Sequence, residues 1–214
     1  MKQNEHGKII AAAAKKYLAP IGARRKGQSR TWLCDQKYWL IMIEFQPSGW
    51  SKGSYLNVGA HWFWYARDHF SFDHGYRIAD FVSFEAKEQF EPESERLALR
   101  AADEVQKIRD NFRSLEEIAR QLTFDVVNGG GGFALYHAAV AAGLVGDISG
   151  SRQLFERVRN HFDGDGWQEN VRSVAAELTK ALPSKHDFRT LVQEIIQRHR
   201  SLNKLPPCPD PLPA

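Results

Sequence analysis

Hydrophobic and polar positions change their period along the chain, which separates a strand-rich first half from a helical second half. Near the N-terminus, Ile9, Ala13 and Tyr17 recur at helical spacing, and the helix that they predict ends before Pro20. Strand patterns follow at residues 30–34, 38–46, 55–65 and 76–84. Because turn-rich loops separate these segments, they predict an antiparallel sheet.

Helical spacing returns after Pro92. An apolar stripe from Leu97 to Phe112 predicts one helix, and Ser114 with Glu117 matches a capping box that starts the next. Four short helices are predicted after the glycines at 129–132. The predicted fold class is therefore α+β: an N-terminal helix and an antiparallel four-stranded sheet packed with helices, followed by an all-helical C-terminal part.

Three segments are expected along the chain. Residues 1–125 form an α+β module, and residues 126–202 form a helical module that begins at the glycine run. Residues 203–214 include five prolines, so we expect a disordered or extended tail there.

Composition narrows the class of protein. Residues 1–90 carry 13 Lys and Arg against 8 Asp and Glu, so the first half is mildly basic. The two cysteines, Cys34 and Cys208, lie far apart, which favours a reducing compartment over a disulfide framework. The apolar run at residues 9–14 is too short for a signal peptide or a membrane span. We therefore expect a cytoplasmic protein with no membrane partner.

Two stretches of the first half, "LAPIGARRKG" and "IEFQPSGWSKGSYLNVG", carry a resemblance to a known family. They resemble the bacterial domain-of-unknown-function family number 4304, except that Ala23 stands where that pattern has an aromatic residue. The matching residues are Pro20, Gly22, Arg25, Lys26, Gly27, Phe45, Gln46, Tyr55, Asn57, Val58 and Gly59. The resemblance implies a bacterial protein, and it brings neither an activity nor functional residues.

The histidines, cysteines, serines and glycines carry no recognisable signature of catalysis or metal binding. His61, His69 and His74 lie near Asp68 and Asp73, but at no spacing typical of a metal site, so they are interpreted as exposed loop residues. The glycine run lacks the Lys-Ser/Thr of a phosphate loop, and no Gly-x-Ser-x-Gly occurs. No catalytic residue, metal or cofactor is predicted.

One face of the expected sheet carries a more specific candidate. If residues 38–46 and 55–65 form a hairpin, Glu44, Gln46, Asn57 and His61 fall on one face. Together with Trp50 in the connecting loop, they form a candidate ligand site in which His61 lies beside Glu44. The alternative is structural, with the same polar groups satisfying one another beneath the helices.

A basic turn offers a different candidate. Arg24, Arg25 and Lys26, with Lys52 elsewhere in the same half, could follow a nucleic-acid backbone while tryptophans stack on bases. The tryptophans alternate with other residues in strands, which directs them toward a core and disfavours this interpretation.

Three functional hypotheses follow. The first is a non-enzymatic binding or interaction module, of an immunity or regulatory type, whose partner is another protein. The second is an enzyme with an unrecognised site on the sheet face, such as a hydrolase using His61 and Glu44. The third is single-stranded nucleic-acid binding through the basic turn.

Overall fold

A computed structural model describes residues 5–213, and their contacts divide them into two compact units. The first unit comprises the chain up to His61 together with Ser71–Asp110. The second comprises Trp62–Phe70 together with residues 111–213. The module boundary expected after residue 125 falls within the second unit, inside a helix.

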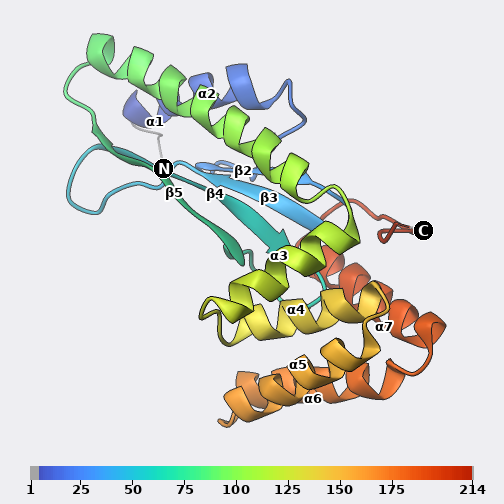
Figure 1. The fold of residues 1–214 in the computed structure, drawn as a ribbon. Coiled ribbons are helices and arrows are strands. Elements are labelled where there is room, and N and C mark those ends of the chain that lie inside the picture. The colour runs from blue at the N-terminus through green and yellow to red at the C-terminus, as the bar shows by residue number, and fades with distance from the viewer. Residues whose placement is uncertain (1–4, 214) are drawn as a thin grey trace. The chain divides into compact units, whose positions relative to one another are not determined.

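The first unit contains an antiparallel sheet in the order β1-β2-β3-β4-β5 (Figure 1). Only Trp62, the last residue of β4, belongs to the second unit. The strands of the sheet are β1 Arg24–Arg25, β2 Thr31–Asp35, β3 Trp39–Glu44, β4 Gly53–Trp62 and β5 His74–Ser83. The predicted antiparallel sheet is confirmed, with five strands in place of four. The additional strand, β1, pairs Arg24 with Leu33. It is only two residues long, so an alternating sequence pattern could not predict it.

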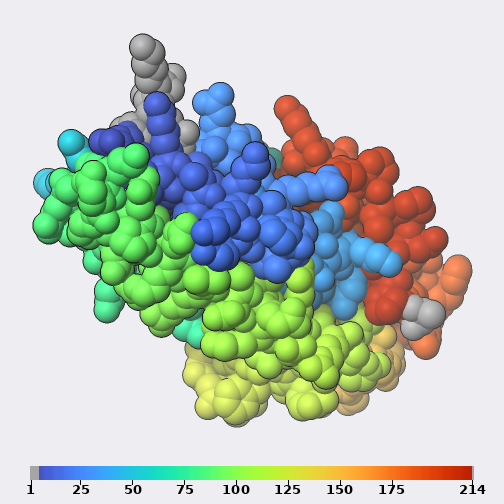
Figure 2. Space-filling model, turned by 90° about the horizontal axis from the view of Figure 1, so that it is seen from above, coloured from blue at the N-terminus to red at the C-terminus, as the bar shows by residue number. Residues whose placement is uncertain are grey.

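Two helices, α1 Glu5–Leu18 and α2 Lys87–Asn111, lie side by side over one face of the sheet (Figures 1 and 2). Lys16 on α1 donates to Glu95 on α2 over 2.8 Å, and Tyr76 on β5 donates to Glu104 over 3.0 Å. The sheet's contribution to the core includes Trp32, Ile41, Ile43, Leu56, Val58 and Ala60, all buried. Helix α2 begins before Pro92, the residue expected to open the helical half.

Five helices make up most of the second unit: α3 Leu115–Val127, α4 Phe133–Leu144, α5 Ile148–His161, α6 Trp167–Ala181 and α7 Lys185–Leu202. Every residue of α4 from Leu135 onward is buried, so this helix is central to the unit. Ser114 caps α3 by accepting a hydrogen bond from the backbone of Glu117, as the capping-box pattern predicts. The helical C-terminal part of the predicted fold is thereby confirmed.

The proline-rich end of the chain runs extended along α7 and is bonded to it. Arg200 on α7 is buried and donates to the carbonyl of Pro206 over 2.7 Å, and Gln197 donates to the carbonyl of Cys208. Leu212 is buried as well. Of the two expected states, disordered or extended, the described residues adopt the extended one. Proline removes only backbone donors, so these carbonyl oxygens remain available as acceptors. Within residues 5–213, no helix is long and apolar enough to cross a membrane.

Candidate binding surface

Asn57, on β4, is the centre of a hydrogen-bonded polar cluster on the face of the sheet opposite α1 and α2. Its side-chain amide donates to Glu44 over 3.1 Å and to Gln46 over 2.9 Å. Arg77 on β5 donates to Gln46 over 2.9 Å and lies 3.4 Å from the Asn57 amide oxygen. We call Glu44, Gln46, Asn57 and Arg77 the sheet-face cluster.

Strand pairing explains why these four side chains meet. Gln46 and Tyr55 exchange two backbone hydrogen bonds of 3.0 and 2.9 Å, which fixes the antiparallel register of the β3–β4 hairpin and confirms that Glu44 lies near Asn57. On the other side, Asn57 pairs with Arg77. Farther along this pair Gly59 faces Gly75, where a Cβ on either residue would overlap the opposite backbone, so the two glycines permit the close approach.

An aromatic contact holds Arg77 in place. Its guanidinium carbon lies 3.9 Å from the ring centroid of Tyr55, a cation–π distance, and the Tyr55 ring lies 5.0 Å from that of Phe81. The sequence pattern missed Arg77 as a member of the cluster. Adjacent Leu56 and Asn57 pair with Ala79 and Arg77, so Ile78 forms a bulge that no period-two pattern reveals.

Trp50 lies in the loop between β3 and β4, the two strands that carry Glu44 and Asn57. The residue is 98% exposed, the highest exposure among the large hydrophobic residues described. The backbone of Trp50 donates to the hydroxyl of Ser48 over 3.1 Å, which stabilises the turn on which the indole is presented. The candidate ligand site of the sequence is therefore assembled from Glu44, Gln46 and Asn57, with Trp50 on the adjoining loop.

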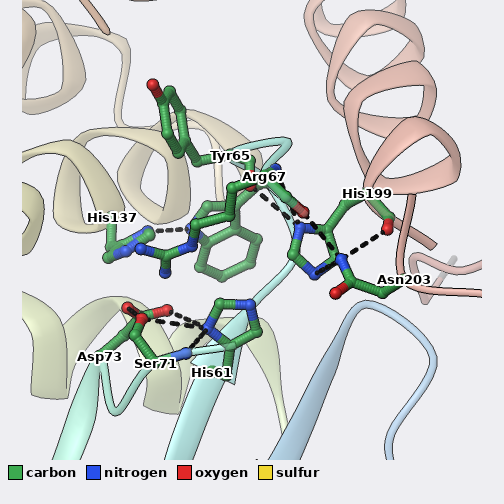
Figure 3. A network of polar contacts seen from close by, with 9 residues as sticks. His61, Tyr65, Arg67, Ser71, Asp73, His137, His199 and Asn203 are labelled. Atoms are coloured by element: carbon green, nitrogen blue, oxygen red, sulfur yellow. Dashed lines mark hydrogen bonds and ion pairs between the residues drawn. The ribbon is translucent and has the colours of Figure 1, made fainter. Parts of the chain in front are cut away.

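His61 stands apart from that cluster. Its Nδ1 lies 2.9 Å from Oδ2 of Asp73, and both side chains are buried (Figure 3). Glu44 instead bonds to Asn57, four residues earlier on β4, so the expected placement of His61 beside Glu44 is wrong. The interpretation of His61 and Asp73 as exposed loop residues is wrong too, because the chain returns at Ser71 and Asp73 to cover the imidazole.

Ser71, Asp73 and His61 do not have the geometry of a catalytic triad. The Ser71 hydroxyl donates to Asp73 over 2.8 Å, and both residues approach the same imidazole nitrogen, Nδ1 of His61. A serine nucleophile needs the base on one ring nitrogen and the orienting carboxylate on the other. The three residues therefore form a buried polar network, which supports the structure of the loop.

The two other histidines of this region differ from His61. His74 is half-buried as the first residue of β5, so its interpretation as an exposed loop residue is wrong. His69 bonds to Asp68 over 3.1 Å, and both side chains are exposed. Among residues 5–213, no group of three His, Cys, Asp or Glu side chains is placed to hold a metal ion.

The basic turn is stabilised by one of its own cations, Arg25. The Arg25 guanidinium donates to the carbonyl oxygens of Ser29 over 2.7 Å and Gln28 over 2.9 Å, so two of its donors close the turn. Arg24 is exposed on β1, an edge strand, where a charged residue discourages pairing with another sheet. Lys26 is exposed in the turn, whereas Lys52 is exposed on the β3–β4 loop.

In the second unit, segment 62–70 is anchored by polar contacts that the sequence did not predict (Figure 3). The Trp64 indole donates to Nδ1 of His137 over 2.8 Å, and Asn203 donates to the carbonyl of Arg67 over 2.7 Å. Nδ1 of His199 lies 3.2 Å from the carbonyl oxygen of Tyr65. These partners are separated by 73 to 136 positions, so no local motif could reveal them.

No protein-family model matches the chain, and neither does any curated protein or solved structure. The resemblance of the first half to bacterial family number 4304 stays a prediction.

Proposed function

We propose that the protein is a non-enzymatic interaction module, of an immunity or regulatory type, that binds another protein through the sheet-face cluster and Trp50. The observation that carries the proposal is the 98% exposure of Trp50 on the loop that joins β3 to β4. An indole left in water forgoes a large hydrophobic stabilisation, which a partner's surface can recover.

The chemistry of the surface supports a protein partner. Tryptophan, tyrosine and arginine are the residues that contribute most to protein–protein binding, and Trp50, Tyr55 and Arg77 are all present. Arg77 is already stacked on Tyr55 and bonded to Gln46, so little side-chain entropy remains to be lost on binding. Glu44 adds a carboxylate, so the surface carries both charge signs and can select a complementary partner.

A binding role is also favoured over catalysis at this site. The cluster contains one carboxylate, two amides and one guanidinium, and these groups satisfy one another. His61, the base of the hydrolase hypothesis, is bonded to Asp73 and away from Glu44. Such an arrangement orients a partner but supplies no nucleophile activated by a base.

Site-specific photo-crosslinking tests the proposal. A photoreactive amino acid replaces Trp50 in the full-length chain in its native cells, and the control replaces Trp167, which is 58% exposed on α6. We expect one protein to be captured from the Trp50 position and not from the Trp167 position. The purified partner should then bind Trp50→Ala and Arg77→Ala at least about tenfold more weakly than the unchanged protein.

Other outcomes would count against a protein partner at this surface. Equal capture at both positions, or unchanged affinity of both alanine variants, would contradict the proposed surface. Capture of an oligonucleotide would instead support the nucleic-acid hypothesis. In that case Arg24→Ala and Lys52→Ala should reduce the affinity and its salt dependence.

A further inference from the structure

A groove of about 240 Å³ lies in the second unit, between α6 and α7, and has no part in the proposed sheet-face surface. Its apolar lining comes from Val174 on α6 and from Leu191 and Ile195 on α7, which are half-buried. Tyr65 and Ala66 of segment 62–70 line it as well. The volume falls below the roughly 300–1,000 Å³ of sites for drug-sized ligands, so the groove suits a short segment that stays partly in solvent.

Charged residues are arranged in order along the groove. On α6 the lining positions are 170, 174 and 177, and on α7 they are 191, 194, 195 and 198, so each helix contributes one face. Because α6 and α7 are antiparallel neighbours joined at residues 182–184, Asn170 lies toward Arg198 and Glu177 lies toward Leu191. Glu177 therefore makes one end acidic and Arg198 makes the other basic, whereas Glu194 lies between them, opposite Val174 and one turn from Arg198.

The basic end also offers hydrogen-bond donors. Tyr65 directs its ring away from the backbone contact with His199 (Figure 3), and its hydroxyl accepts a hydrogen bond of 3.0 Å from the side chain of Asn170. Since the hydroxyl is the acceptor in that bond, its own proton remains available for an anion. Arg198 and Tyr65 together suit a carboxylate.

A second groove, in the first unit, provides a comparison. It lies between α1 and α2 and is also lined by charged residues, among them Lys16, Glu91 and Glu95. There the charges are paired, because Lys16 bonds to Glu95 over 2.8 Å and Lys87 lies 3.6 Å from Glu91. In the α6–α7 groove, by contrast, the described residues provide no ion pair for Glu194 or Arg198. Because its charges are not neutralised within the protein, the α6–α7 groove is the better of the two sites for a charged ligand.

We propose that the α6–α7 groove binds a short peptide with free termini, about three residues long. Glu177 and Asn170 are seven positions apart on one helix, which corresponds to about 10.5 Å along its axis. An extended tripeptide spans about 10 Å. Its ammonium group would lie at Glu177, its carboxylate at Arg198 and Tyr65, and an apolar central side chain against Val174 and Ile195.

Isothermal titration calorimetry with defined peptides tests the proposal on the full-length protein. Ala-Leu-Ala with free termini is titrated to about 10 mM, alongside the same peptide acetylated and amidated. We expect the free peptide to bind and the blocked peptide to bind at least about fivefold more weakly, because both terminal charges are lost. Absence of binding by the free peptide, or equal binding by the two, would overturn the proposal.

Charge-removing variants locate the site. Arg198→Gln and Glu177→Gln should each weaken the free peptide about two- to fivefold, since each removes one exposed ion pair. The controls are Arg189→Gln and Glu169→Gln, which lie on α7 and α6 but outside the lining of the groove. If the controls weaken binding as much as the groove variants, the site is wrong. None of these residues belongs to the first unit, so failure here leaves the sheet-face proposal intact.

Discussion

His61 and Asp73 form a buried pair, with 2.9 Å between Nδ1 and Oδ2 and side-chain exposures of 0% and 4%. Replacing His61 by phenylalanine keeps an aromatic ring but removes the polar partner of a buried carboxylate. We expect His61→Phe to lower the free energy of unfolding by about 1–3 kcal/mol, the cost typical of leaving a buried polar group without one of its partners. Urea denaturation at pH 7 measures the change.

The chain supplies its own control for this experiment. His69 and Asp68 form a pair of similar length, 3.1 Å, but their side chains are 65% and 83% exposed. His69→Phe should change the unfolding free energy by less than about 0.5 kcal/mol, because water replaces the lost interaction. Equal effects of the two substitutions would mean that burial does not set the strength of the His61 pair. The expected result also makes His61→Phe unsuitable as a probe of ligand binding.

Asn57 links the members of the sheet-face cluster, so replacing it should lower the stability of the protein. Asn57→Ala leaves Glu44 and Gln46 without their shared donor, so we expect a loss of about 1–2 kcal/mol in unfolding free energy. Glu44→Gln should cost less than about 0.5 kcal/mol, because an amide oxygen still accepts the Asn57 hydrogen bond. Thermal and urea unfolding of both variants test the difference. Equal stability of Asn57→Ala and the unchanged protein would mean that water substitutes for the amide.

Part of this surface could be predicted from the sequence, since alternation in two strands around one hairpin places Glu44, Gln46 and Asn57 on the same face. Arg77 could not be, because the bulge at Ile78 sets its register. The position of His61 was misjudged for a related reason. Alternation along the strand predicts which face His61 lies on. It does not predict that Asp73 becomes its partner, because that contact depends on the path of the loop after β4.

The second unit shows the same limit. Helices α4 to α7 followed from apolar periodicity and turn residues. Ser184 caps α7 by accepting a hydrogen bond from the backbone of Asp187. Trp64 was predicted to lie in the sheet, within the strand at residues 55–65. Its indole instead donates a hydrogen bond to His137 on α4. The pattern of a single strand cannot show that its last residues leave the sheet and enter a helical unit. That arrangement depends on contacts 73 positions apart.

The two cysteines should differ sharply in reactivity. Cys34 is fully buried, and burial raises the pKa of its thiol to about 11, although Arg109 acts in the opposite direction. At pH 8 only about one thiol in a thousand would then be the reactive thiolate. Cys208 is partly exposed. Iodoacetamide followed by mass spectrometry should label Cys208 first and Cys34 only after denaturation; rapid labelling of Cys34 would show that its strand opens readily.

His6 on α1 should make stability sensitive to acid. Its side chain is 5% exposed, with its ring 5.6 Å from Phe84 and 6.5 Å from Phe90. Burial lowers the pKa of His6 below its ordinary 6.5, and the positive charges of Arg30 and Lys52 lower it further. The folded state therefore favours the neutral imidazole, whereas the unfolded chain takes up a proton near pH 6.5.

Because the unfolded state binds more protons in this range, the free energy of unfolding should fall as the pH drops below about 6.5 and should be constant, as far as His6 is concerned, above it. His6→Phe removes the titration, so its stability difference between pH 8 and pH 5.5 should be smaller than that of the unchanged protein. His186→Phe, at an exposed position on α7, is the control and should retain the full difference. Urea unfolding at both pH values measures these free energies. If His6→Phe shows the same difference between pH 8 and pH 5.5 as the unchanged protein, groups other than His6 cause the acid sensitivity.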